Sequence, residues 1–249
     1  MCGIGSISSK YLSANALLRE FTDMCYLSYV ARRGKHSSGM AWLDAIGGKI
    51  CTTRELGPPG EACFTSTTLG VQTHSVLGHV RYASCGAVTV RNAHPIFNEN
   101  EKLALVHNGH IVHHSELRKR LTDRGHKFRT DTDSEVILHI FEDELGSVDQ
   151  SPKNILKATI HAARACVGQK NFIILFDDDT MAAYSDGTLS MDRQENRIVL
   201  ASVPTTRSHN WSRLPYGTAL VIKKGELLAR EFDISVFSID SECDSGWSK

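Results

Sequence analysis

The sequence lacks the features that would point to a membrane, a nucleic acid or a secreted protein. Its longest uninterrupted hydrophobic run is 172–176, far shorter than the ~20 residues that a membrane-spanning helix needs. Lys and Arg number 28 and Asp and Glu also number 28, so no net charge attracts nucleic acid or anionic lipid. Residues 1–12 contain neither the basic nor the hydrophobic segment of a secretory signal. We expect a cytoplasmic protein that binds neither nucleic acid nor membrane.

Cysteine and histidine are present without the spacing of a metal or disulfide framework. The seven cysteines are odd in number and scattered, and no C-x-x-C pair occurs among them. The histidines at 107, 110, 113 and 114 are close in sequence, but no cysteine or carboxylate completes a usual ligand set beside them. His113 and His114 precede Ser115, a candidate helix N-cap, and we expect both to face solvent. The sequence predicts no metal and no cofactor.

The order of predicted elements indicates an α+β fold in a single domain over residues 1–249. No linker or internal repeat divides the chain, and strands are followed by helices and then by strands, which favours antiparallel layers over a parallel α/β array. Asn108-Gly109 is predicted as a sharp turn at the end of a strand, and residues 56–68 as a loop. The hydrophobic pattern predicts helices over 14–32, 116–124, 134–145 and 153–167, and strands over 1–8, 40–45, 49–54, 76–82, 103–107, 171–176, 181–185, 197–203, 218–223 and 226–232.

Five short motifs occur in an order that resembles the glutaminase domain of class II glutamine amidotransferases, the N-terminal-nucleophile type. Each motif alone is weak evidence, since Asn-Gly by itself is a common turn dipeptide. The resemblance covers essentially the whole chain and implies a four-layer αββα sandwich with antiparallel sheets. The motifs are Cys2-Gly3-Ile4-Gly5, Arg33-Gly34-Lys35-His36-Ser37-Ser38-Gly39, Gly78-His79-Val80-Arg81-Tyr82-Ala83-Ser84, His107-Asn108-Gly109 and Thr132-Asp133-Ser134-Glu135-Val136.

An N-terminal cysteine suits the chemistry that this resemblance implies. Hydrolysis of an amide needs a nucleophile, a base of suitable pKa and donors for the oxyanion of the tetrahedral intermediate. The Cys2 thiolate would be the nucleophile, and its own α-amine, with an ordinary pKa of ~7.7–8.0, would be the base. This arrangement requires removal of Met1, which we expect because cysteine is a small residue.

The resemblance also implies roles for individual residues. Asn108 would be the side-chain donor of the oxyanion hole, and the Gly109 backbone N–H the second donor. Arg81 would hold the α-carboxylate of glutamine and Asp133 its α-ammonium group, so that free glutamine is selected over a peptide-bound residue. Arg33 would lie near the nucleophile and favour the thiolate. Catalytic roles are thus implied for Cys2, Asn108, Gly109 and Arg33, and substrate binding for Arg81, Asp133, Ser84 and Gly109.

Two local departures from the family pattern leave the subfamily open. The chain has Arg81-Tyr82-Ala83-Ser84-Cys85-Gly86 where some members have Arg-Trp-Ala-Thr-His-Gly. The Arg-Tyr pair is similar to the amidophosphoribosyltransferase branch, whereas Asn92-Ala93-His94-Pro95 is similar to the glucosamine-phosphate synthase branch. The departure also places a second thiol, Cys85, near the nucleophile, and we hypothesise that oxidation could link it to Cys2.

The resemblance implies that full-length synthases of this family join a glutaminase domain to a larger domain that uses the ammonia. We expect no such second domain in these 249 residues. The preferred hypothesis is that ammonia passes to a separate synthase subunit. Two alternatives remain open at this stage: a glutamine-binding regulatory subunit without turnover, and an N-terminal-nucleophile amidohydrolase that acts on another γ-glutamyl amide. Segments 34–39 and 83–88 are predicted to be mobile loops over the pocket.

Overall fold

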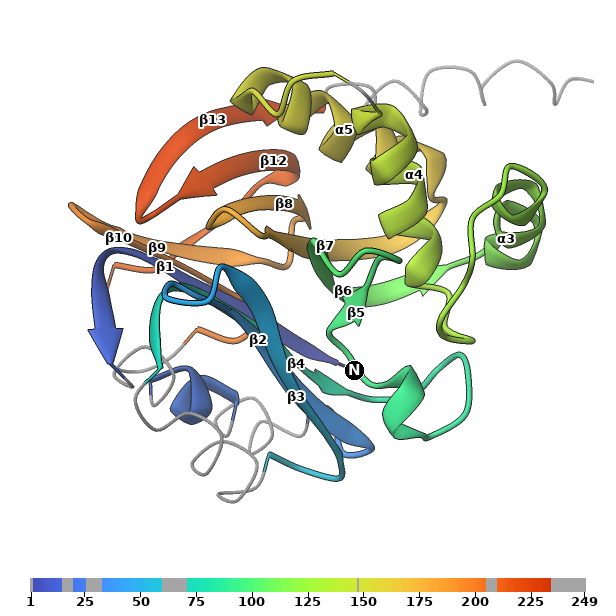
Figure 1. Cartoon of the computed structure of the whole chain (residues 1–249), viewed down its shortest axis with the longest axis horizontal. Coiled ribbons are helices and arrows are strands. Elements are labelled where there is room, and N and C mark those ends of the chain that lie inside the picture. Colours follow the sequence, from blue (N-terminus) through green and yellow to red (C-terminus); the bar gives the residue numbers. More distant parts are fainter. Residues whose placement is uncertain are drawn as a thin grey trace, which may run out of the picture.

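The computed structural model describes residues 2–14, 20–25, 33–59, 71–146, 148–204 and 210–233. Two antiparallel β-sheets stack face to face, and helices cover the outer faces (Figure 1). The seven-stranded sheet has the order β11-β9-β10-β1-β4-β2-β3. Its strands are β1 (Gly3–Ala14), β2 (Ser37–Asp44), β3 (Lys49–Leu56), β4 (Gln72–Arg81), β9 (Ser190–Gln194), β10 (Arg197–Ala201) and β11 (Ser212–Arg213).

The six-stranded sheet has the order β13-β12-β8-β7-β6-β5. Its strands are β5 (Ile96–Phe97), β6 (Leu103–Ile111), β7 (Gly168–Phe176), β8 (Thr180–Asp186), β12 (Tyr216–Lys223) and β13 (Glu226–Phe232). The described helices with complete bounds are α3 (His114–Asp123), α4 (Glu135–Leu145), α5 (Pro152–Ala165) and the short 3-10 helix η1 (Val90–Asn92), and residues 20–25 are also helical.

Alternation of side chains along the strands produces the four layers. On β6, Ala104 and Val106 pack between the two sheets, whereas Leu103 and Leu105 pack under α4 and α5. On β1, Ile4 points between the sheets and Ile7 points to the opposite face, where it packs with Phe21 of the helical segment 20–25. Figure 1 shows α4 and α5 over one sheet and the short blue helix beneath the other. The expected αββα arrangement of antiparallel sheets is therefore confirmed.

Local sequence signals place several elements correctly. Ser151 accepts a hydrogen bond from the backbone N–H of Asn154, and Pro152 occupies the first turn of α5, as their N-cap and N1 positions predict. The predicted hairpins are confirmed as β2–β3 and as β12–β13, which turns at Lys224-Gly225. Both residues of that turn have positive φ, which glycine adopts without a steric cost.

Other predictions from the sequence were wrong. Asn108-Gly109 is not a turn, because β6 continues through both residues to Ile111 and pairs with β7 along its whole length. Strand β1 extends to Ala14, where a helix was predicted to begin, and strand β9 was not predicted. Of the predicted helix 14–32, only 20–25 is seen as helix, and 15–19 and 26–32 lie outside the described residues, as does most of the predicted loop 56–68.

The α3 region also differs from the prediction. Helix α3 begins at His114 with His113 at the N-cap, and that cap makes no side-chain hydrogen bond, so Ser115 is not the capping residue. His113 is exposed as expected, but His114 is half-buried, because its ring contacts Ile111 and Cys85.

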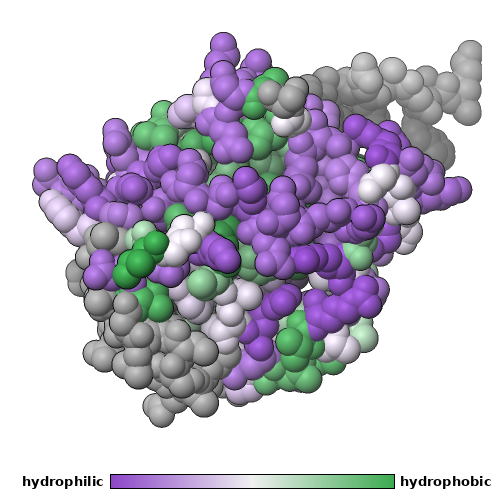
Figure 2. Space-filling model, in the orientation of Figure 1, coloured by the Kyte–Doolittle hydropathy of each residue, from purple (hydrophilic) through white to green (hydrophobic). Residues whose placement is uncertain are grey.

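The visible surface is largely hydrophilic. In Figure 2 hydrophobic residues form only small, separate patches on this face. Within the described part of the chain, no helix has the length and hydropathy needed to cross a bilayer.

Candidate active site

Cys2 lies at the start of β1, which is held between β4 and β10. Gly3 pairs with Val80, and the backbone N–H of Tyr82 donates to Cys2 Sγ at 3.2 Å. The Cys2 thiol also lies 3.4 Å from the Tyr82 carbonyl oxygen, to which it can donate. Arg33 Nη1 donates to the Cys2 carbonyl oxygen at 3.2 Å. The backbone on both sides of the thiol is thereby fixed, and the Arg33 guanidinium lies next to the Cys2 backbone.

The surroundings of Cys2 keep the thiol protonated. Burial raises the pKa of Cys2, while the hydrogen bond from Tyr82 and the positive charge of Arg81 lower it less than burial raises it. A thiol with a raised pKa forms little thiolate at neutral pH, so a nearby base must take its proton during a reaction.

Asn108 and Gly109 occupy the facing sheet. Side chains alternate between the two faces of a strand, so Asn108 points to the same face of β6 as Ala104 and Val106, which lie between the sheets. By the same alternation Cys2 points to the same side as Ile4, which also lies between the sheets. The alternation thus directs Asn108 and Cys2 toward the same inter-sheet space. Gly109 lines the cavity of Cys2, and a Cβ at this position would overlap the carbonyl oxygen of Gln169 on β7, so the close strand approach requires glycine.

Arg81 ends β4 and is buried, with only 3% of its surface exposed. Its guanidinium donates to three consecutive carbonyl oxygens of the following loop: Cys85 at 2.5 Å, Gly86 at 3.4 Å and Ala87 at 3.2 Å. Arg81 therefore organises the 83–88 segment. These guanidinium N–H groups are the donors that we expected, from the sequence, to bind the α-carboxylate of glutamine.

Asp133 is buried at the segment that leads into α4. Its Oδ2 accepts a hydrogen bond from the backbone N–H of Ile111 at 2.8 Å and lies 3.6 Å from His110 Nδ1. The carboxylate is thereby attached to the end of β6, three residues after Asn108. Asp133 is not the helix cap, since Ser134 holds that position.

Glu135 shapes the segment that carries Asp133. This fully buried carboxylate accepts hydrogen bonds from the backbone N–H groups of Arg129 at 2.6 Å and Thr130 at 2.7 Å. Burial acts to raise the pKa of Glu135, but hydrogen bonds from His139, Arg129 and Thr130 outweigh it, so the net pKa is lowered and the group is ionised. Ionised Glu135 holds residues 129–133 in a fixed turn.

One small cavity brings most of the predicted residues together. Its volume of about 10 Å³ is enough for roughly one water molecule, far less than an amino acid needs. Ser84 is exposed at its rim, and entry of a larger ligand requires outward movement of the 83–88 segment. The cavity is lined by Cys2, Arg81, Tyr82, Ser84, Cys85, His94, His107, Gly109, Thr132, Asp133 and Ser134.

Cys85 also faces this cavity, as the sequence indicated. Its Sγ lies 3.5 Å from His114 Nε2 and 3.7 Å from the Asp131 carbonyl oxygen. Burial and the negative charge of Asp133 raise the pKa of the Cys85 thiol. The site thus holds two protonated thiols on its walls.

A buried histidine cluster at the cavity was not predicted; it consists of His94 and His107, which line the cavity, and of His79. The rings of His79 and His94 stack with centroids 4.2 Å apart, and His79 Nε2 lies 3.0 Å from the His107 carbonyl oxygen. His107 Nδ1 contacts Ser134 Oγ at 2.8 Å, which ties β6 to the start of α4. These residues come from β4, a loop and β6, so only the folded chain brings them together.

Burial keeps this histidine cluster neutral. It lowers the pKa of His79 to about 3 and the pKa of His94 well below its ordinary value, and it also lowers the pKa of His107. The sequence signal was present but was assigned otherwise, since His107 was considered with a surface histidine group and His94 only as part of a family motif.

Comparison with known proteins agrees with this geometry. Residues 24–151, just over half of the chain, match the family described as "Glutamine amidotransferase domain". The chain is 28% identical over 245 residues to amidophosphoribosyltransferase of Methanocaldococcus jannaschii, covering 95% of this chain and 50% of that protein. It is 34% identical over 205 residues to glutamine–fructose-6-phosphate aminotransferase (isomerizing) of Thermus thermophilus, covering 81% of this chain and 32% of that protein.

The solved structure of glutamine phosphoribosylpyrophosphate amidotransferase from B. subtilis has a similar fold. The two structures superpose with a TM-score of 0.72 at 22% sequence identity. The matched region covers 93% of this chain and 49% of the B. subtilis chain. The fold, with a cysteine at the start of a central strand, defines the class of N-terminal-nucleophile glutaminase domains. The chain belongs to the glutamine amidotransferase domain family, class II. It spans half or less of the length of these curated relatives.

Proposed function

We propose that this chain hydrolyses the side-chain amide of free L-glutamine to glutamate and ammonia through a thioester on Cys2. The observation that carries the proposal is that Cys2, Gly109, Arg81 and Asp133 line one cavity, although they come from four separate parts of the sequence. The membership of the chain in the class II amidotransferase family supports the same chemistry.

Each step follows from a group at the site. With Met1 removed, the α-amine of Cys2 takes the thiol proton as the sulfur attacks the amide carbon. The oxyanion of the tetrahedral intermediate is stabilised by the Asn108 side chain and the Gly109 N–H. The α-amine returns the proton to the leaving nitrogen, the C–N bond of the tetrahedral intermediate breaks, and ammonia departs, which leaves the glutamyl thioester on Cys2. Water then attacks the thioester with the same amine as base, which releases glutamate and restores the thiol.

Arg81 and Asp133 supply the selectivity for a free amino acid. A guanidinium matches the α-carboxylate, and the buried Asp133 carboxylate matches the α-ammonium group. A ligand blocked at either end would leave a buried charge without its partner, which is costly. Since the Arg81 donors are occupied by loop carbonyls, substrate entry must couple carboxylate binding to displacement of the 83–88 segment.

Intact mass measurement with an electrophilic glutamine analogue tests this function. We expect loss of Met1 followed by one stoichiometric adduct, and no adduct in a Cys2→Ala variant. Glutamine should protect the wild-type chain, whereas N-acetylglutamine and glutamine α-amide should not. A processed chain that takes no label would contradict turnover and favour a regulatory subunit. Equal protection by the blocked compounds would instead favour an amidohydrolase for other γ-glutamyl amides.

We further propose that the ammonia is delivered to a separate synthase subunit. The relatives that the chain matches are at least about twice as long as the matched region, and released ammonia is lost to solvent unless an acceptor site is close. Size-exclusion chromatography of an untreated cell extract, with glutaminase activity assayed across the fractions, tests this. We expect activity above the monomer mass, and full activity confined to a monomer peak would contradict it.

A further inference from the structure

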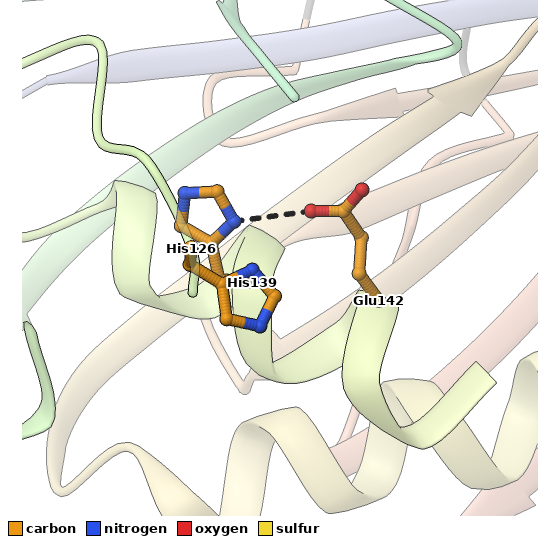
Figure 3. A group of neighbouring side chains, drawn as sticks. All are labelled: His126, His139 and Glu142. Carbon is orange, nitrogen blue, oxygen red and sulfur yellow. Dashed lines mark hydrogen bonds and ion pairs between the residues drawn. The ribbon is translucent and has the colours of Figure 1, made fainter. Parts of the chain in front are cut away.

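A group of three potential metal ligands lies away from the cavity of Cys2, between the α3–α4 connection and α4. We call it the histidine–glutamate group, and it consists of His126, His139 and Glu142 (Figure 3). One nitrogen or oxygen from each side chain lies within 4.8 Å of those of the other two. His139 and Glu142 are three residues apart on α4, so they share one face of the helix, and His126 approaches that face from the preceding connection.

The partners of these side chains are those that orient ligands at metal sites. Metal-bound histidines usually face a carboxylate with their second ring nitrogen. While His139 Nδ1 lies 3.1 Å from Glu142 Oε2, its Nε2 lies 3.6 Å from Glu135 Oε1. Asn98 Nδ2 donates to Glu142 Oε1 at 2.7 Å, which leaves Oε2 facing the histidine. The Asn98 contact is a hydrogen bond, and Glu135 lies just beyond hydrogen-bond distance of the second nitrogen of His139.

A further carboxylate, Asp143, contacts one member of the histidine–glutamate group. Asp143 Oδ1 lies 2.8 Å from His126 Nε2, and Arg124 pairs with the other oxygen, Oδ2, at 2.9 Å. The carboxylates of Glu135, Glu142 and Asp143 thus face His126, His139 and the guanidinium of Arg124. Burial acts to lower the pKa of His139, but its contacts with Glu135 and Glu142 outweigh burial and raise the pKa to about 9, so a metal cation would bind there in place of a proton. Asp143 also lines a hollow of about 430 Å³ between α3, α4 and α5, which gives a route from solvent.

We propose that His126, His139 and Glu142 bind one zinc-class divalent cation, with Asp143 beside His126 as a supporting carboxylate. Two imidazole nitrogens and a carboxylate oxygen are a ligand set that suits zinc better than calcium or magnesium. Tetrahedral zinc places ligand atoms about 3.3 Å apart at bond lengths of ~2.0–2.1 Å, so the side chains need to contract by roughly an ångström.

The position of this group gives a bound cation a structural consequence. His126 belongs to the connection between α3 and α4, whose later residues include Asp133, and the other two ligands belong to α4 itself. A cation would join the connection to the helix on the side away from Cys2. Two of the three ligands, His139 and Glu142, come from one segment of α4, so most of the site is built into one helix.

Metal titration of chelator-treated protein tests the proposal. We use the Cys2→Ala variant as the background, because a free N-terminal cysteine can itself bind zinc. We expect one equivalent of Zn²⁺ to bind with micromolar or tighter affinity and to raise the Tm. Co²⁺ in the same site should give the visible absorption of tetrahedral coordination by nitrogen and oxygen, without the near-ultraviolet band of thiolate ligands.

Matched variants separate this site from others. His126→Gln and Glu142→Gln should weaken Zn²⁺ binding at least tenfold and abolish the rise in Tm on metal addition. His161→Gln, an exposed histidine that pairs with Glu144 at 3.5 Å, should leave both unchanged. The readout is the change in Tm caused by metal, so a variant that is merely less stable is not mistaken for one that lost the site. Binding that is equal in all three variants, or absent from the background protein, would overturn the proposal.

Discussion

The guanidinium of Arg81 lies 2.5 Å from the carbonyl oxygen of Cys85, four residues further along the chain. The donors proposed to hold a substrate carboxylate therefore hold the adjoining loop in the closed cavity. A carboxylate is a stronger acceptor than a peptide carbonyl, so substrate can replace these contacts. Binding and loop movement are then one event, governed by one side chain.

The first prediction concerns Arg81→Lys. Lysine keeps the charge but has no planar pair of donors, so both the carboxylate contact and the loop contacts weaken. We expect the KM for glutamine to rise by ~10–100-fold, the equivalent of about 1.5–3 kcal/mol for a charge-assisted contact, with a smaller change in kcat. Steady-state kinetics checks this beside Arg91→Lys, an exposed arginine near the same loop. An unchanged KM would contradict carboxylate binding by Arg81.

The second prediction concerns the oxyanion hole. Asn108→Ala should lower kcat by ~10²–10³ with little change in KM, because the lost donor acts on charge that develops only in the transition state. The far-ultraviolet circular dichroism spectrum and the Tm should stay close to wild type. Asn100→Ala, at an exposed position, is the control and should retain full activity. A fall confined to KM would place Asn108 in ground-state binding instead.

The third prediction concerns the reactivity of the nucleophile. Because burial raises the pKa of Cys2, its alkylation by iodoacetamide in the processed chain should rise with pH and have a midpoint above the ordinary cysteine pKa of ~8.5. Peptide mass spectrometry after timed labelling measures this at Cys2 alone. A midpoint near neutral pH would show that the thiolate is already formed at rest, and that no base is needed for the first step.

The fourth prediction concerns stability in mild acid. His79, His94 and His107 have lowered pKa values in the folded chain, so between pH 6.5 and their folded values only the unfolded chain takes up these protons. The stability that they contribute is complete above pH ~6.5 and is lost as the pH falls. Between pH 7 and 5.5 His79 and His94 should each lower the free energy of unfolding by about 1 kcal/mol, and His107 acts in the same direction. His139, whose pKa is raised to about 9, acts in the opposite direction and offsets part of this loss.

Urea unfolding at a series of pH values measures this slope. His79→Asn should reduce the slope of the unfolding free energy against pH by the equivalent of about one proton. His113→Asn, at an exposed position, should not change this slope. A stability that is constant from pH 7 to 5.5 would mean that the folded and the unfolded chain take up equal numbers of protons over this range, which contradicts the lowered pKa values of these rings.

The fifth prediction concerns oxidation. Cys2 and Cys85 line the same cavity, and we expect treatment with oxidised glutathione to join them with loss of two hydrogens and of activity. Since burial raises the pKa of both thiols, the reaction should be slow at neutral pH and faster at higher pH. A thiol reductant should restore activity, and Cys85→Ser should resist inactivation. Inactivation without a Cys2–Cys85 peptide would remove this hypothesis.

Regular periodicity was enough to predict most of the elements, because strands such as β7 and helices such as α5 carry their signals within a few residues. Asn108-Gly109 shows where this fails. The dipeptide favours a turn locally, but pairing with β7 keeps both residues in a strand, and the absence of a side chain at Gly109 is used for close approach to Gln169 instead. That residues 1–249 form one domain remains a prediction.

The motif order pointed to five residues that line one cavity, but Asn108 and Arg33, which it also pointed to, are not among the lining residues. Arg81, Asp133 and Gly109 line the cavity as expected, whereas the contacts of Arg81 with the loop carbonyls are invisible in the sequence. The buried histidines and the histidine–glutamate group were missed for a related reason. Their members are separated along the chain, and only the packing of α4 and of β4 against β6 brings them within reach of one another.

Strand β1 lies between two strands that are far apart in the sequence, so the two sides of the strand that follows Cys2 become paired at different times during synthesis. Gly5 pairs with Gly78 on one side and with Ala201 on the other. During synthesis the second neighbouring strand does not exist until residues 197–201 have left the ribosome, so the end of the chain that bears Cys2 stays unpaired on that side for most of translation. The removal of Met1 that the proposed function requires therefore has a long interval in which to occur, before the sheet closes around Cys2.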